Sequence, residues 1–163
     1  MAHIRLYHPS DAGEVVSLNL RQADVDEIVA ATGLTPSECL EYSIESSEYV
    51  WVIIHDMGHI VGVFGLSSTK DINGNPVGVP WLLSTDDLKD FRYAFSKYSW
   101  GVVEFMSQQY NYLTNYVDSR HKQAIKWLKW LGFTIHADIP ITLHDKAVTF
   151  YRFSMVKYDP TSN

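Results

Sequence analysis

The sequence predicts an α/β fold within one domain. Three observations support this prediction: strand-like and helix-like segments alternate along the chain, two β-branched runs flank a short connection at residues 56–58, and a strand, a helix and a strand follow one another at 113–135. The 163 residues, 46% of them hydrophobic, suffice for one buried core. We therefore expect a single domain over residues 1–158 and a polar tail at 159–163.

The N-terminal part predicts one strand followed by helices. Residues 3–7 are typical of a strand, and the Pro-Ser-Asp sequence at 9–11 begins a helix, because proline suits the first turn and the polar side chains can cap it. A second helix is expected at 24–31 and ends at Gly33, and a third begins at Pro36. We expect these helices to cover one face of a sheet.

The middle of the chain predicts a hairpin, a third strand and a long helix. Residues 49–55 and 59–66 are rich in β-branched and aromatic side chains, and the glycine-containing connection at 56–58 suits a tight turn. Residues 79–83 form the next expected strand. Apolar residues then recur every three or four positions, which predicts one amphipathic helix over 84–110.

The segment that follows is a strand, a helix and another strand. Residues 113–117 are typical of a partly buried strand, and Asp118 and Ser119 offer oxygens that could cap a helix. An apolar stripe runs from Ala124 to Leu131, and Gly132 stands where helices commonly end. The remaining strands are expected at 133–135 and 148–158.

Charge and composition exclude several classes of function. The net charge of −6 argues against nonspecific binding to nucleic acid or anionic membranes, which requires clustered Lys and Arg. The N-terminus lacks a signal-peptide core, and no apolar run approaches the roughly 20 residues of a membrane helix. The single Cys39 fits a reducing compartment. We expect a protein that is neither secreted nor membrane-bound.

Two histidines are spaced like a helical metal-binding pair. His55 and His59 are four residues apart, but the predicted hairpin places them on either side of a turn, and no third ligand is evident. We therefore predict no metal site.

The helix at 121–133 resembles a motif of the GNAT superfamily of N-acetyltransferases, Asn-x-x-Ala-x-x-x-Tyr-x-x-x-Gly-Phe. Ala124 and Gly132 match it, whereas His121 stands at the Asn position and Leu128 at the Tyr that protonates the leaving thiolate. The resemblance implies a mixed central sheet of about six to seven strands flanked by helices on both faces. It also implies N-acetylation with acetyl-CoA as the acyl donor.

The resemblance places acetyl-CoA at the ends of the strands at 79–83 and 113–117. In the superfamily a glycine-rich loop after the fourth strand holds the pyrophosphate, whereas residues 84–92 here contain no glycine and three aspartates. Each nearby acid could oppose a phosphate by about 1 kcal/mol, so we expect acetyl-CoA binding to be weakened or rearranged. The residues assigned to the cofactor are Leu82, Leu83, Ser84, Thr85, Lys89, Arg92, Asn115 and Ala124.

Several residues are alternative candidates for the catalytic base and the catalytic acid. Asp118 and His121 are the candidate catalytic bases for removing a proton from an acceptor amine. The position of Asp118 and Ser119 favours a cap of the following helix over a catalytic role, and His121 could be a surface residue. Further candidates are Glu104 as a base and Tyr112 or Tyr116 as an acid.

A narrower resemblance concerns the source and role of the protein. Residues 20–28, 81–86, 115–118 and 126–133 resemble GNAT-like proteins encoded among the virion-assembly genes of short-tailed phages. This resemblance implies a protein in the host cytoplasm or the virion. Three functions stay open: an acetyltransferase acting on a host or phage protein or a small amine, a non-catalytic virion-assembly protein that keeps the scaffold, and a module that binds a host protein.

Overall fold

A computed structural model describes residues 3–157, except for the side chains of residues 92 and 93. Within this part of the chain, seven strands form one mixed sheet in the order β1-β2-β3-β4-β5-β7-β6. The strands are β1 (His3–Leu6), β2 (Ser47–Ile54), β3 (Ile60–Lys70), β4 (Pro76–Ser84), β5 (Tyr112–Asp118), β6 (Thr134–Ile141) and β7 (Phe150–Val156). The helices are η1 (Pro9–Asp11), α1 (Ala12–Val16), α2 (Gln22–Thr32), α3 (Pro36–Ser46), η2 (Asp86–Phe91), α4 (Arg92–Gln109) and α5 (Lys122–Trp130).

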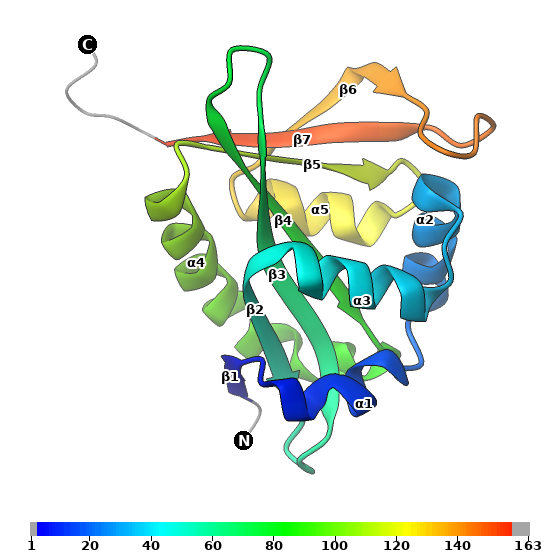
Figure 1. The fold of residues 1–163 in the computed structure, drawn as a ribbon, viewed down its shortest axis with the longest axis vertical. Helices are drawn as coiled ribbons and strands as arrows, with labels where there is room; N and C mark the ends of the chain where they lie inside the picture. The colour runs from blue at the N-terminus through cyan, green and yellow to red at the C-terminus, as the bar shows by residue number, and fades with distance from the viewer. Residues whose placement is uncertain (1–2, 158–163) are drawn as a thin grey trace.

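The helices cover both faces of the sheet (Figure 1). On one face α1, α2 and α3 bury a core with β2 and β3, and on the other α4 and α5 bury a second core with β3 and β5. The predicted α/β architecture, with its strand number and its two helical layers, is therefore confirmed. The first core includes Val15, Ile28, Leu40, Val52 and Val63, and the second includes Val61, Leu66, Met106, Leu113 and Leu128.

The local signals at α2 and α3 act as the sequence predicts. Gly33 ends α2 in a left-handed conformation with a φ of 71°. The Thr35 hydroxyl then accepts a hydrogen bond from the backbone N–H of Glu38, and Pro36 occupies the first turn of α3. These signals fix where α2 ends and where α3 begins.

The parallel strands β4 and β5 diverge after a single paired position. Gly78 pairs with Leu113, and no further register pair joins the two strands within the described residues. Beyond that point Pro80 has no N–H to donate, and its carbonyl instead accepts a hydrogen bond of 2.8 Å from the Asn115 side-chain amide. The gap between the strands therefore opens towards their carboxyl ends.

The predicted helix over 84–110 is wrong in its first part. The segment begins as η2, a 3₁₀ helix, and becomes α-helical only in α4. Leu88 and Phe91, three residues apart, are both buried against the sheet, and a 3₁₀ helix brings positions at that spacing onto one side. Thr85 is also tied to β3, because its N–H donates to the Val61 carbonyl.

Asp118 does not cap α5, contrary to one of the two predicted roles. It is the last residue of β5, and its carboxylate accepts hydrogen bonds from the backbone and side chain of Arg120. α5 has no side-chain N-cap, and Gly132 follows it with a φ of 99°, as predicted. The final strand ends at Val156, and the predicted tail at 159–163 lies outside the described residues. None of the described helices combines the length and apolar character needed to cross a membrane.

Candidate functional site

A cavity of about 1010 Å³ lies where β4 and β5 diverge. Its walls come from both layers of helices: Ile28 of α2 and Cys39 of α3 line one part, and Val103 of α4 and Trp127 of α5 line another. Residues 81–83 of β4 and 115–117 of β5 lie between them. The cavity therefore reaches both layers through the opening in the sheet.

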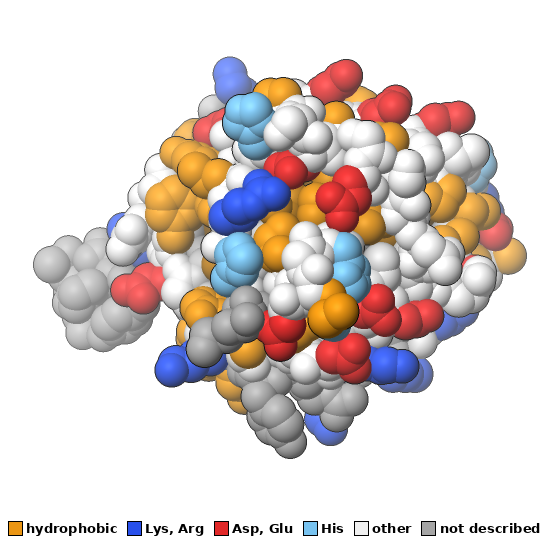
Figure 2. Space-filling view, turned by 90° about the horizontal axis from the view of Figure 1, so that it is seen from below, with side chains coloured by type: hydrophobic (Ala, Val, Ile, Leu, Met, Phe, Trp, Pro, Cys, Tyr) orange, Lys and Arg blue, Asp and Glu red, His pale blue; other side chains and the backbone are white. Residues whose placement is uncertain are grey.

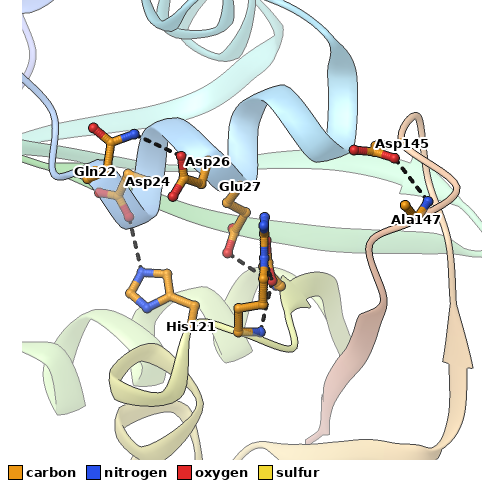
Figure 3. Close-up of polar contacts among 9 residues, drawn as sticks. Gln22, Asp24, Asp26, Glu27, His121, Asp145 and Ala147 are labelled. Atoms are coloured by element: carbon orange, nitrogen blue, oxygen red, sulfur yellow. Dashed lines mark hydrogen bonds and ion pairs between the residues drawn. The ribbon is translucent and has the colours of Figure 1, made fainter.

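Asp24 of α2 lines this cavity and contacts His121 (Figure 3). The carboxylate is 3% exposed and accepts hydrogen bonds from Arg21 Nη2 at 2.9 Å, His121 Nε2 at 3.2 Å and the Ser84 N–H at 3.0 Å. Burial alone would raise the pKa of Asp24, but the bonds from His121 and Arg21 outweigh it and hold the pKa below its ordinary value. Asp24 is therefore a paired carboxylate that joins α2, β4 and the β5–α5 connection.

Asp118 is not among the residues that line the cavity, and its carboxylate is also paired with an arginine. Its side chain is almost fully buried, and Arg120 donates to it through Nε at 3.0 Å and Nη2 at 2.6 Å. Burial opposes ionisation here too, but the hydrogen bonds from Arg120 lower the pKa of Asp118. The carboxylate is thus occupied by a guanidinium, while the backbone N–H of Asp118 points to a third acid.

That third acid is Glu27 of α2, which sequence reasoning missed. Its Oε2 accepts the Asp118 N–H at 3.1 Å (Figure 3), and none of the ion pairs among the described residues involves Glu27. Burial, supported by the charges of Asp24 and Asp118, raises the pKa of Glu27 to about 7, although the hydrogen bond from Asp118 and the nearby His121 act in the opposite direction. A carboxyl group in a cavity whose pKa is about 7 is suited to proton transfer, because it can both accept and release a proton near neutral pH.

The predicted candidates His121 and Asp118 therefore do lie close together, but each already has a partner. The structure does not bring the other predicted base, Glu104, to the cavity, because it is exposed on α4. Tyr116 lines the cavity, whereas the Tyr112 hydroxyl bonds with Arg152.

The predicted cofactor-binding residues divide into three groups. Leu82, Leu83, Lys89, Asn115 and Ala124 line the cavity. Asn115 is already engaged, since its amide donates to Pro80 and accepts from the Tyr116 N–H. Ser84 and Thr85 lie outside the lining, and the side chain of Arg92 is not among the described ones.

A second group of titratable side chains lies where η2 meets the β2–β3 connection. Figure 2 views this end of the molecule and shows histidine and acidic side chains near one another. His55 and His59 stack with ring centroids 4.4 Å apart, and their Nε2 atoms lie 4.0 Å from Asp90 and 3.6 Å from Asp87. The described residues hold no group of three or more ligands able to bind a metal ion.

Comparisons with solved structures define the fold class. The structure resembles a GCN5-related N-acetyltransferase from Kribbella flavida (14% identity, 96% of this chain and 98% of the other, TM-score 0.70). It also resembles a GNAT-family acetyltransferase from Streptococcus pneumoniae (16%, 97% and 100%, 0.65) and the spermidine N-acetyltransferase of Vibrio cholerae in complex with CoA and spermine (10%, 95% and 95%, 0.68). The sequence matches no family model and no curated protein. At these identities the likeness shows the fold, which is that of the GNAT N-acetyltransferases.

The cavity fits the thioester arm of acetyl-CoA better than its diphosphate. Leu82, Leu83 and Ala124 give the opening between β4 and β5 apolar walls, which could contact the carbon atoms of an acyl-pantetheine chain. A diphosphate would meet η2, which has acids in its first turn, and Asp86 lines the cavity there. Lys89 and Lys126 line the cavity as well and could hold phosphate oxygens in place of a glycine loop, whereas Arg21, the other described cation of the lining, is paired with Asp24.

Proposed function

We propose that the protein is an acetyl-CoA-dependent N-acetyltransferase in which Glu27 is the general base. The single observation that carries this proposal is a carboxyl with a pKa of about 7 at the opening between β4 and β5. The fold supports it, because the similar solved structures include N-acetyltransferases. Fold alone would not assign an activity, so the argument depends on the side chains of the cavity.

Glu27 would take a proton from the ammonium group of the acceptor, which frees the nitrogen lone pair to attack. Acetyl-CoA supplies the activated acetyl thioester: the new C–N bond forms as the C–S bond breaks. Tyr116 lines the same cavity, and we assign its phenol to protonate the leaving sulfur and to recover a proton from the acetylated nitrogen. The proton taken by Glu27 then passes to solvent, so that protons balance.

Asp118 and His121 act in this scheme as positioning residues. The Asp118 N–H holds the Glu27 carboxylate, and Arg120 fixes the side chain of Asp118. His121 ties the β5–α5 connection to Asp24 on the same helix as Glu27. Both predicted residues thus contribute by holding α2 over the cavity rather than by touching the acceptor.

The test is the pH dependence of acetyl transfer to primary amines. We expect kcat/KM for the wild type to rise as the pH passes through about 7, because Glu27 must be ionised to accept the proton. Glu27→Gln keeps the shape of the side chain and should lower kcat/KM by roughly 10²- to 10⁴-fold. The matched control is Glu104→Gln, outside the cavity on α4. Equal rates for Glu27→Gln and the wild type would refute the role of Glu27.

A second candidate function is a virion-assembly protein that keeps the scaffold without catalysis, present in the host cytoplasm or the virion. The observation that favours it is η2, where Asp86 lines the cavity and glycine is absent from residues 84–92. Calorimetric titration with acetyl-CoA and with desulfo-CoA separates the two candidates. Micromolar binding supports the enzyme, and absence of heat at millimolar ligand supports the non-catalytic protein.

A further inference from the structure

We infer that the acceptor is a small primary monoamine with an apolar or aromatic body. The inference rests on the proposed function in placing the amine nitrogen at Glu27, and it concerns what the rest of the cavity around that carboxylate can accommodate. Two independent features of the α2 and α3 side carry it: the number of unpaired charges and the nature of the walls.

The charges leave room for one ammonium group. Three acids line the cavity: Asp24, Glu27 and Asp86. Asp24 is neutralised by Arg21 and hydrogen-bonded to His121, and Asp86 lies on η2 among the residues that face the diphosphate. Among the described residues, Glu27 is therefore the one acid of α2 that lines the cavity and has no ion-pair partner. A polyamine would bring a second ammonium group that finds no carboxylate there.

The walls next to Glu27 are apolar. The cavity is lined here by four side chains without charge: Ile28 and Ala31 of α2, Cys39 of α3 and Leu143. Burial, and then the charge of Glu27, raise the pKa of the Cys39 thiol, which places the two side chains in the same surroundings. The body of the acceptor therefore meets carbon and sulfur atoms.

The hydroxyl groups of Thr32 and Ser43, on the α2 and α3 side of the cavity, already have partners within the protein. The Thr32 hydroxyl donates to the Ile28 carbonyl at 2.7 Å. Ser43 lies 3.9 Å from the Cys39 sulfur, and its carbonyl accepts the Ser47 hydroxyl. A sugar or a peptide acceptor would lose hydration here without gaining matched hydrogen bonds.

Trp81 of β4 adds a fixed aromatic wall. Its indole N–H donates to the Ser47 hydroxyl at 2.8 Å. Its ring packs so closely on Gly65 of β3 that a Cβ atom at this glycine would lie 2.7 Å from the ring. The ring is thus held from two sides, and a rigid aromatic surface favours an apolar or aromatic body.

The first experiment measures amine binding to the full chain by ligand-observed NMR at pH 8, without acetyl-CoA. The probes are 2-phenylethylamine, 2-phenylethanol, which lacks the ammonium group, and spermidine. We expect the alcohol and spermidine to bind roughly tenfold or more weakly than 2-phenylethylamine, since neither pairs its polar groups fully. Equal or tighter binding of spermidine would overturn the inference.

Two variants test the position of the site. Ala31→Leu fills the cavity from α2 and should weaken 2-phenylethylamine binding by roughly tenfold, whereas Ala23→Leu, the same change at an exposed position of α2 outside the cavity, should leave it unchanged. Glu27→Gln should remove most of the preference for the amine over the alcohol. If the Ala31→Leu and Ala23→Leu variants bind 2-phenylethylamine equally tightly, the assigned position of the site is contradicted. An unchanged preference of Glu27→Gln for the amine over the alcohol would contradict it as well.

Acetyl-CoA calorimetry on the same samples separates this inference from the proposed function. Selective amine binding without acetyl-CoA binding supports the inference and contradicts the acetyltransferase. Acetyl-CoA binding together with preferred acetylation of spermidine or of a lysine peptide contradicts the inference and supports the acetyltransferase. Absence of both kinds of binding overturns both.

Discussion

Three carboxylates within one small site have different properties because their partners differ. Asp24 and Asp118 are less exposed to solvent than Glu27, yet each pairs with an arginine, and their pKa values are lowered. Glu27 receives one backbone N–H and the repulsion of its two acidic neighbours, and its pKa is raised. Burial alone would raise the pKa of all three, so the hydrogen-bond partners decide the outcome: His121 and Arg21 lower the pKa of Asp24, and Arg120 lowers that of Asp118.

The raised pKa of Glu27 predicts how stability depends on pH. The folded protein binds this proton more tightly than the unfolded chain, so ionisation of Glu27 lowers the free energy of unfolding as the pH rises from 4.5 to about 7. Glu27→Gln removes that loss and should stabilise the protein at pH 8 by roughly 1–3 kcal/mol, relative to its effect at pH 4. Urea unfolding at both pH values checks this, and the same difference at pH 4 and pH 8 would contradict it.

Asp24 should show the opposite behaviour. Its lowered pKa means that its ion pair and hydrogen bonds stabilise the fold above the ordinary pKa of an aspartate and lose this effect as the pH falls through the folded value. At pH 7 Asp24→Asn should cost roughly 3 kcal/mol, because Arg21 stays behind without its partner. The control is Asp26→Asn, two residues along α2, whose exposed side chain bonds with Gln22 and should cost under about 0.5 kcal/mol. Equal costs, measured by urea unfolding, would contradict this account.

The sequence pointed to the right neighbourhood of the site but not to Glu27. Asp118 and His121 were predictable as candidates because they follow a strand and open a helix. Glu27 lies 91 residues before Asp118, and the hydrogen bond between them depends on how α2 docks on the sheet. The available signal was that Asp24 and Glu27 are three residues apart on one helix and therefore share a face with the apolar Ile28.

At the scale of elements, periodicity predicted the helices and strands well but not the type of η2. The apolar spacing from Leu88 onwards fits both an α-helix and a 3₁₀ turn, because residues three apart share a side in both. The tie between Thr85 and Val61 is a contact between distant segments, and no local pattern reports it. The ends of α2 and α3 were predictable because their glycine and threonine signals act locally.

Two glycines next to or within helices predict opposite effects of the same substitution. Gly132 has a φ of 99°, so Gly132→Ala forces an alanine into a left-handed conformation and should destabilise the protein by roughly 1 kcal/mol or more. Gly101 lies within α4, where an added Cβ would meet no atom within 4 Å, and Gly101→Ala should stabilise by roughly 0.5–1 kcal/mol. Thermal unfolding of the two variants checks both signs, and a shift in the same direction would contradict the account.

At the scale of the whole molecule, the opening between β4 and β5 connects the two helical layers. Within the described residues the two strands pair only at Gly78, and the Asn115 side chain joins them at Pro80, so that no backbone pairing closes the opening towards their carboxyl ends. The alternation of strands and helices was enough to predict the fold class, which solved structures of 10–16% identity share. No local sequence pattern sets the register that creates the opening, since it depends on contacts between β4 and β5 across more than thirty residues.

The whole account depends on the Glu27 carboxyl at this opening, whose pKa is raised to about 7. A ¹³C NMR titration of the Glu27 side-chain carboxyl in the full chain, with Glu27→Gln to assign its signal, measures that property directly. We predict a midpoint at about pH 7. A midpoint near 4.5, the ordinary value, would show a carboxyl that ionises as in water and would contradict its role as the base.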